Sequence, residues 1–79
     1  MRLDKYLKVS RIIKRRTIAN QLCDAKHVDV NGKAARASYE VKVGDVIGIQ
    51  MGQTLRKFEV LTVAEHASKE GADELFRPL

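Results

Sequence analysis

The start of the chain carries a dense set of basic side chains whose chemistry suits the binding of phosphate groups. Its first sixteen residues, MRLDKYLKVSRIIKRR, hold seven cations and a single acid, Asp4. Like charges at helical spacing repel one another, so a solvated helix face usually mixes signs. We therefore infer an acidic partner outside the chain, with an ordinary solvated face as the alternative. The seven cations are Arg2, Lys5, Lys8, Arg11, Lys14, Arg15 and Arg16.

The spacing of these cations indicates where phosphates would bind. Lys5 and Lys8 are three residues apart and share a helix face, and Arg11 extends their row. The cations at 14–16 surround the start of a second expected helix, where each opposes the helix dipole at a cost of about 0.3 kcal/mol or more. A bound phosphate would turn that cost into a gain, and such local conflicts are typical of functional positions. Two cations that could extend the same surface are Lys33 and Arg36.

Residues suited to catalysis or metal binding are few. His27 and His66 are the only histidines, and neither belongs to a metalloprotease motif, a paired carboxylate site or a nucleophile elbow. Asp4 could act as a base, but its place in the first turn of a helix favours capping of free amides or an ion pair that orients a nearby arginine. Cys23 is the only cysteine, which excludes an intramolecular disulfide and indicates a small buried side chain. We expect no enzymatic activity, no metal and no cofactor.

Charge is distributed unevenly along the 79 residues, whose net charge is +5. Residues 1–42 hold eleven lysines or arginines against four acids, whereas residues 43–79 hold four against six. A polarised basic surface indicates a polyanionic partner, nucleic acid first and an anionic membrane second. No stretch approaches the roughly 20 apolar residues of a membrane span, and the first helix is too short to bury a wide apolar face in a membrane surface. We expect a cytoplasmic protein without a membrane partner.

Two short helices must position the cations. Apolar residues recur at helical spacing over residues 2–9, and a turn follows near Ser10. A second helix is predicted from residue 15 or 16 to residue 25. Its inner stripe is expected to consist of Ile18, Ala19 and Leu22. Joined by a brief turn, the two segments would form a helical hairpin.

Short strands are predicted to follow the helices. In HVDVNGKAAR, apolar residues alternate with polar ones, and Asn31–Gly32 is a strong hairpin signal with residues 33–36 returning antiparallel. Further strands are expected at VIGIQ, after the turn Gly44–Asp45, and over residues 54–63. The predicted fold class is therefore α+β, with two helices followed by about four strands.

The segment after residue 63 differs from the rest of the chain. Residues 64–79 are polar, contain Gly71 and end in Pro78-Leu79, so we expect a fraying tail or a short docked helix there. The predicted organisation is one domain over residues 1–63 and a polar tail over residues 64–79.

Two kinds of nucleic acid could bind the cationic surface. Duplex DNA would require the second helix to enter a major groove, and its expected outward positions do include Asn20 and Gln21. However, the sequence has no obvious dimer element for reading paired half-sites. RNA suits a single small domain better, because folded RNA can be recognised by its shape and phosphate placement.

Four motifs taken together resemble a known family, the RNA-binding domain named after small-subunit ribosomal protein S-four. They are RLDKYL, RRTIANQL, HVDVNG and VKVGD, and they run in order from Arg2 to Asp45. Each motif alone is weak, but their order and spacing together are specific. The compact form, with KVSRIIKRRT and no catalytic domain within the chain, is most similar to the RqcP family of bacterial ribosome-associated quality control, relatives of heat-shock protein fifteen.

This resemblance implies a helical hairpin packed on a small, bent antiparallel sheet, with cations facing ribosomal RNA of the large subunit. It implies a place on stalled, dissociated large subunits that still hold peptidyl-tRNA. It also implies action with the tail-adding factor RqcH in template-free addition of C-terminal alanines. By matching positions, Arg2 and Arg16 are the first choices for RNA contact, with Lys14 and Arg15 beside them. Asp4 would orient these residues or lie near the tRNA, and we expect a monomer.

One departure from the family pattern is Lys26, which stands where the motif usually has glycine before the HVDVNG segment. A lysine must either adopt the left-handed conformation that ends the helix, at about 1 kcal/mol, or avoid it. Two other functions remain open from the sequence. One is a recycling factor for obstructed large subunits, like heat-shock protein fifteen, and the other is a regulatory RNA-binding domain of an RNA-modifying enzyme such as a pseudouridine synthase.

Overall fold

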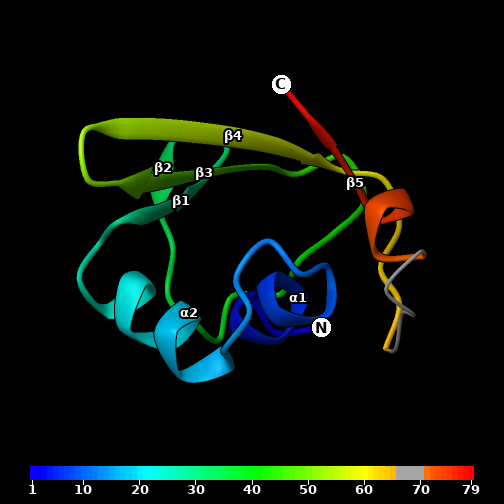
Figure 1. The fold of residues 1–79 in the computed structure, drawn as a ribbon, viewed down its shortest axis with the longest axis horizontal. Helices are drawn as coiled ribbons and strands as arrows, with labels where there is room; N and C mark the ends of the chain where they lie inside the picture. Colours follow the sequence, from blue (N-terminus) through cyan, green and yellow to red (C-terminus); the bar gives the residue numbers. More distant parts are fainter. Residues whose placement is uncertain (66–70) are drawn as a thin grey trace.

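Two helices form one layer of the molecule and an antiparallel sheet forms the other (Figure 1). The structure is a computed structural model. It describes residues 1–65 and 71–79, without the side chains of residues 72 and 73. His66 lies outside the described residues. The helical hairpin packed on an antiparallel sheet confirms the predicted α+β fold. No helix in the described ranges is both long and apolar enough to cross a membrane.

The first helix, α1, spans Leu3–Val9 and presents a fully buried stripe to the sheet. Leu3, Tyr6 and Leu7 have no exposed surface, which agrees with the helical spacing of these residues. Ser10 ends the helix, and its hydroxyl donates a hydrogen bond to the carbonyl of Tyr6 at 2.7 Å. Arg11 then adopts a left-handed conformation with φ of 61°. The helix and the turn predicted from the sequence are confirmed.

The second helix, α2, spans Arg16–Asp24 and packs through small side chains. Ala19 and Cys23 are buried, and Leu22 packs against the core from its edge. The prediction that Ile18 belongs to the inner stripe is wrong, because 42% of Ile18 is exposed. Residues 19 and 23 are four apart and define the contact face, which leaves Ile18 turned away from it. Cys23 is the small buried side chain that the sequence predicts.

The end of α2 shows how the chain accommodates Lys26 without a glycine. Lys26 adopts φ of 63°, so the left-handed conformation is present despite its side chain. Its N–H donates to the carbonyl of Cys23 at 3.0 Å, and the N–H of His27 donates to the carbonyl of Leu22 at 2.9 Å. This pair of bonds is a Schellman motif, which satisfies carbonyls at the helix end.

The sheet contains five strands in the described residues, in the order β2-β1-β3-β4-β5. All neighbouring strands run antiparallel. The hairpin turn between β1 and β2 has Asn31 at φ 54° and Gly32 at φ 85°, as a type I′ turn requires. The strand bounds are Val28–Val30 for β1, Lys33–Ala34 for β2, Val46–Met51 for β3, Thr54–Val60 for β4 and Phe76–Pro78 for β5.

Two predicted strands are longer than the observed ones. β2 ends at residue 34 instead of 36, and β4 ends at residue 60 instead of 63. Beyond Val60 the chain leaves the ladder, because the N–H groups of Leu61 and Thr62 both donate to the carbonyl of Leu75.

The C-terminal segment contributes a fifth strand where we expected a fraying tail or a short docked helix. A 3-10 turn, η1, spans Gly71–Glu74, and β5 then pairs with residues 58–60 of β4. Leu75 is buried, and the ring of Phe76 packs edge-on against Phe58 with centroids 5.2 Å apart. Leu75 and Phe76 are too short an apolar run to show the alternation of a strand in the sequence. In the structure they complete one end of the core. The end of the RNA-binding domain at residue 63 stays a prediction.

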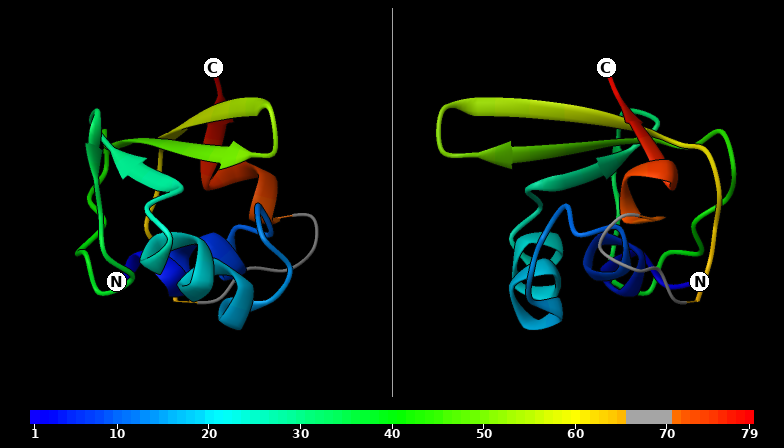
Figure 2. Two further views of the ribbon diagram at one scale, coloured as in Figure 1. Left: turned by 90° about the vertical axis from the view of Figure 1, so that its left-hand side faces the viewer. Right: turned by 45° about the vertical axis from the view of Figure 1, so that its right-hand side comes forward.

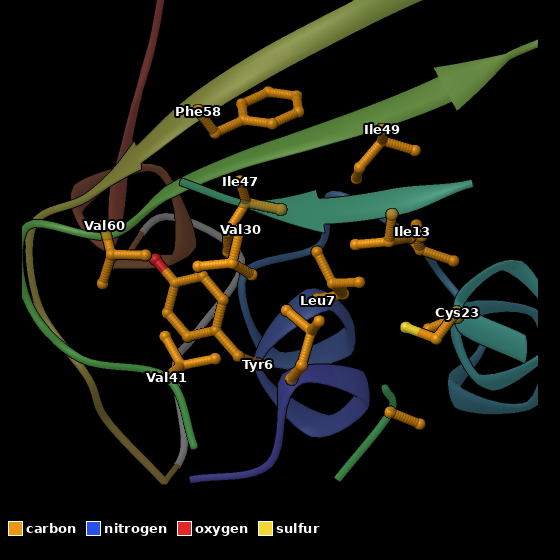
Figure 3. Packing of buried hydrophobic residues seen from close by; sticks show 14 of the residues in the cluster. Tyr6, Leu7, Ile13, Cys23, Val30, Val41, Ile47, Ile49, Phe58 and Val60 are labelled. Atoms are coloured by element: carbon orange, nitrogen blue, oxygen red, sulfur yellow. The ribbon is translucent and has the colours of Figure 1, made fainter. Parts of the chain in front are cut away.

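The core lies between α1, α2 and the inner face of the sheet (Figure 3). Tyr6 and Leu7 of α1 point toward Ile47 and Val60 of the sheet. The Tyr6 hydroxyl donates to the carbonyl of Leu75 at 2.6 Å, which ties α1 to the segment before β5. Burial raises the pKa of Tyr6, which therefore remains a hydrogen-bond donor.

A buried carboxylate joins the hairpin turn to the start of β3. Asp45 accepts hydrogen bonds from the Asn31 amide at 3.1 Å, the Tyr39 hydroxyl at 2.9 Å and the Lys42 N–H at 2.9 Å. Burial alone would raise the pKa of Asp45, but the hydrogen bonds from Lys42, Asn31 and Tyr39 outweigh it, and the pKa is lowered. The sequence signals VNG and VGD therefore meet in one hydrogen-bonded network.

Candidate nucleic-acid interface

Asp4 is the buried centre of a polar cluster formed by side chains of α1, of α2 and of the residue before α1. It lies in the first turn of α1 and only 2% of its surface is exposed. Its carboxylate is 3.2 Å from Nε of Arg2 and 3.4 Å from Nε of Arg16, the first residue of α2. The carboxylate also accepts bonds from the Lys5 N–H at 2.8 Å and the Asn20 amide at 3.3 Å. We call Arg2, Asp4, Arg16 and Asn20 the Asp4 cluster.

The cluster keeps Asp4 ionised although it is buried. Burial by itself raises the pKa of the carboxyl group, because it disfavours the charged form. The hydrogen bonds from Asn20, Arg16 and the Lys5 N–H, together with the positive charge of Arg16, lower the pKa by more, so the net shift is downward. At neutral pH the cluster therefore contains one anion and two guanidinium groups.

The arrangement displays two arginines side by side at the surface. About half of each side chain is exposed, 50% for Arg2 and 45% for Arg16. One carboxylate uses part of the donor capacity of each guanidinium and fixes its position, while the remaining N–H groups stay available. A guanidinium held in this way can grip a phosphate through two parallel hydrogen bonds. Beside the cluster, a hollow of ≈ 380 Å³ is lined by Asp4, Arg16, Thr17, Asn20 and Gln21.

Both structural roles considered for Asp4 are present in the structure. Its carboxylate accepts a hydrogen bond from the Lys5 N–H in the first turn of α1, and it forms ion pairs with Arg2 and Arg16. These contacts bring together Arg2 and Arg16, which are fourteen positions apart in the sequence. Whether either arginine contacts RNA remains a prediction.

The other basic residues of the first half are not part of the Asp4 cluster. Lys5 is partly buried and forms an ion pair with Glu65, an anion that the sequence reading did not connect with it. The exposed cations of α1, the following turn and the approach to α2 are Lys8, Arg11, Lys14 and Arg15. Whether these four side chains contact RNA remains a prediction.

Lys33 and Arg36 lie at the edge of the sheet formed by β2. They line a hollow of ≈ 620 Å³ with Tyr39, and Arg36 also lines a second hollow with Lys26 at the end of α2. Neither hollow includes a residue of the Asp4 cluster. The structure therefore groups Arg36 with Lys33 in one hollow and with Lys26 in the other, apart from Arg2 and Arg16.

Asn20 is a residue whose place the sequence reading misjudged. The DNA hypothesis put it on the outward face of the second helix, available to a base edge. Its amide instead donates to Asp4, while the neighbouring Gln21 is exposed. Asn20 follows Arg16 by four residues and so shares a helix face with it, which is the sequence signal that could have identified it.

Residues that could carry catalysis or bind a metal are not assembled in the described parts of the chain. No group of three or more His, Cys, Asp or Glu residues in these parts could hold a metal ion. Burial, together with the charges of Asp4 and Asp24, raises the pKa of Cys23 to about 11, so the thiol stays protonated and poorly nucleophilic at neutral pH. His27 is exposed.

Residues 1–47 match the family model of the S4 domain, the RNA-binding domain that takes its name from the ribosomal protein. The match covers both helices, the first hairpin and the start of β3. The chain is therefore an S4-domain protein.

Several relatives with similar sequences share one name. "RQC P-site tRNA stabilizing factor" from Halalkalibacterium halodurans is 49% identical over 76 residues, 96% of this chain and 86% of the relative. The Bacillus subtilis protein of the same name is 43% identical over 96% of this chain and 88% of its own length. The chain belongs to this family of S4-domain proteins, and the resemblance to the RqcP family is confirmed.

Solved structures agree with this assignment. The trimeric structure of heat shock protein 15 from Vibrio cholerae matches with a TM-score of 0.91 at 26% identity, over all of this chain and 81% of that one. The solution structure of the hypothetical protein HP1423 matches with a TM-score of 0.85 at 30% identity, over all of this chain and 96% of that one. The likeness includes β5 and η1, since both matches cover the whole of this chain.

Proposed function

We propose that this protein is a non-enzymatic RNA-binding factor of bacterial ribosome-associated quality control. It binds ribosomal RNA of the large subunit and the peptidyl-tRNA that remains on stalled, dissociated large subunits. The observation that carries this proposal is the Asp4 cluster, in which one buried carboxylate fixes two half-exposed arginines. The names of its relatives support the same role, because they describe stabilisation of a tRNA in the P site.

The Asp4 cluster is the ribosomal RNA contact in this proposal. Fixing the guanidinium groups before binding reduces the side-chain entropy that the complex would otherwise lose. The exposed cations of residues 8–15 add contacts that are electrostatic and independent of sequence, which suits recognition of folded RNA by its phosphates.

A peptidyl-tRNA provides a second polyanionic surface beside the ribosomal RNA. A small domain that contacts both surfaces binds more tightly through effective concentration, without a large interface with either one. The protein would act as a monomer in the cytoplasm, on the ribosome. By holding the tRNA in place, it supports the alanine additions that the tail-adding factor RqcH carries out.

The direct test compares binding to purified large subunits with and without peptidyl-tRNA. We expect tighter binding to subunits that carry the tRNA, and more alanine addition in a reconstituted reaction with RqcH when the protein is present. Arg16→Ala should weaken binding to both kinds of subunit. Equal affinity for the two kinds of subunit, together with unchanged alanine addition, would contradict the proposal.

A second candidate is a recycling factor for obstructed large subunits, like heat-shock protein fifteen. The TM-score of 0.91 with the Vibrio cholerae protein favours keeping it. The same reconstituted reaction separates the two functions. A recycling factor would promote release or relocation of the tRNA and would not raise the number of alanines added to each chain.

A further inference from the structure

The free end of the β3–β4 hairpin is a second exposed surface, distinct from the helices. β1 pairs with residues 47–49 of β3, and β5 pairs with residues 58–60 of β4. Beyond these points the ladder joins Gln50 with Leu55 and Met51 with Thr54, and only the base of this end bonds to other segments of the described chain: the N–H of Gln50 donates to the carbonyl of His27, and the N–H of Leu79 donates to the carbonyl of Lys57. Residues 51–57 are all exposed. In the right-hand view of Figure 2 this end extends past the helices.

The charge of this hairpin suits a polyanion. Residues 46–58 contain Arg56 and Lys57 and no acid. Within the described parts of the chain neither cation forms an ion pair, and the next acid along the strand, Glu59, is already paired with Arg77. On the outer face of the sheet, Gly48 of β3 pairs with Asp29 of β1 on one side and with Lys57 of β4 on the other. The carboxylate of Asp29 lies over Gly48, between its own strand and Lys57.

Arg56 is held in position by aromatic packing. Its guanidinium carbon lies 5.2 Å from the centroid of the Phe58 ring, and that ring packs edge-on against Phe76. A stacked guanidinium keeps its N–H groups free at the ring's edge, where they can donate to an oxygen. On the opposite face of the strand, which Leu55 shares with Lys57, 51% of Leu55 is exposed, and Met51 is exposed at the turn. The end of the hairpin thus combines two cations with apolar side chains.

These side chains fit RNA better than a protein groove. Cations would contact phosphates, and the short apolar side chains would lie on ribose surfaces in the wide, shallow minor groove of an A-form helix. A surface that binds a protein typically carries a large aromatic side chain that fills a pocket on its partner. Residues 50–57 contain no aromatic residue.

We propose that the free end of the β3–β4 hairpin, residues 50–57, binds the backbone of the tRNA on the large subunit. This inference rests on the proposed function, in which the Asp4 cluster of the helix layer binds ribosomal RNA. The hairpin belongs to the sheet layer and reaches out beyond its neighbouring strands, so it is available to the second polyanion (Figures 1 and 2).

The test uses hairpin variants and a matched control outside the hairpin. The variants are Lys57→Ala and the double variant Arg56→Ala with Lys57→Ala, and the control is Lys42→Ala, which also removes one exposed lysine. Each is measured for binding to large subunits with and without peptidyl-tRNA. Because the changed side chains are exposed, the fold should persist, which circular dichroism and thermal unfolding check.

We expect the double variant to bind empty subunits as the wild type does and to lose roughly tenfold of the extra affinity for subunits with tRNA. Lys42→Ala should keep that extra affinity. A photo-crosslinker at Gln53, in the turn of the hairpin, should label tRNA. Equal loss on both kinds of subunit, no loss at all, or labelling of ribosomal RNA or protein in place of tRNA would overturn the inference.

The two proposals fail in different ways. A wild type that does not distinguish subunits with tRNA from empty ones contradicts the proposed function and this inference with it. A wild type that does distinguish them, with hairpin variants that distinguish them equally well, overturns the inference alone.

Discussion

At the scale of single residues, Asp4 decides how the cationic end of the chain is organised. A buried carboxylate that lacked partners would be neutralised, but here four groups donate to it and it stays charged. The fixed anion then gathers two arginines that would otherwise repel one another. The single acid among the seven cations therefore acts by fixing the positions of the arginines, and not by reducing the positive charge.

Asn20 provides the sharpest test of this ordering. We expect Asn20→Ala to remove one hydrogen bond to the Asp4 carboxylate and to raise the pKa of Asp4 toward its ordinary value. Loss of one bond to a charged group costs roughly 1.5–3 kcal/mol of folding stability. Ribosome binding should weaken as well, because the arginines are then held less firmly. The measurements are an NMR titration of Asp4 and binding to large subunits.

Gln21→Ala is the matched control for the pKa, because Gln21 is exposed and next to Asn20 on the same helix. Since Gln21 lines the hollow beside the Asp4 cluster, this variant controls for the pKa of Asp4 alone, which it should leave unchanged. An unchanged Asp4 pKa in Asn20→Ala would mean that the amide does not support the ionised carboxylate.

At the scale of elements, the end of α2 holds a backbone strain that a single substitution can relieve. Lys26→Gly should raise the free energy of unfolding by about 1 kcal/mol, because glycine adopts φ of 63° without the side-chain penalty. For a domain of this size that corresponds to roughly 4–8 °C in Tm. Lys26→Ala removes the same charge but retains a Cβ, so it should give little of this gain. Equal gains for both variants would assign the effect to charge.

The link between the hairpin turn and β3 should make stability depend on pH. The pKa of Asp45 is lower in the folded protein, so its contribution is fully present above the unfolded-state value of about 3.9 and is lost as the pH falls through the folded-state value. Asp45→Asn should lower stability at neutral pH and reduce the loss of stability on acidification. The check is the free energy of unfolding by urea at several pH values. A variant with the same acid dependence as the wild type would show that other carboxylates cause it.

At the scale of the whole molecule, the charge is divided between a strongly basic first half and a slightly acidic second half. The first sixteen residues carry seven of the fifteen lysines and arginines, yet the acid-free end of the β3–β4 hairpin, residues 50–57, belongs to the slightly acidic half. Two surfaces within extents of 28 × 24 × 23 Å could thus face two different polyanions.

Binding to large subunits should therefore depend steeply on salt. Four to six phosphate contacts give a slope of log K against log salt of about −3 to −5, since each contact releases condensed counterions. Arg16→Ala should reduce the magnitude of the slope by about 1. The measurement is affinity across low to physiological salt. A slope near zero would contradict an electrostatic basis for binding.

The sequence by itself determined the elements that depend on local spacing. The two helices follow from apolar residues at helical period, and the first hairpin follows from Asn31–Gly32, because these signals act between neighbours in the chain. Tertiary structure alone decided what side chains from distant segments do together. Asp4 and Arg16 meet because α1 packs on α2, and Leu75 and Phe76 form part of the core because β5 pairs with β4. Such contacts depend on how the elements pack, which no local pattern specifies.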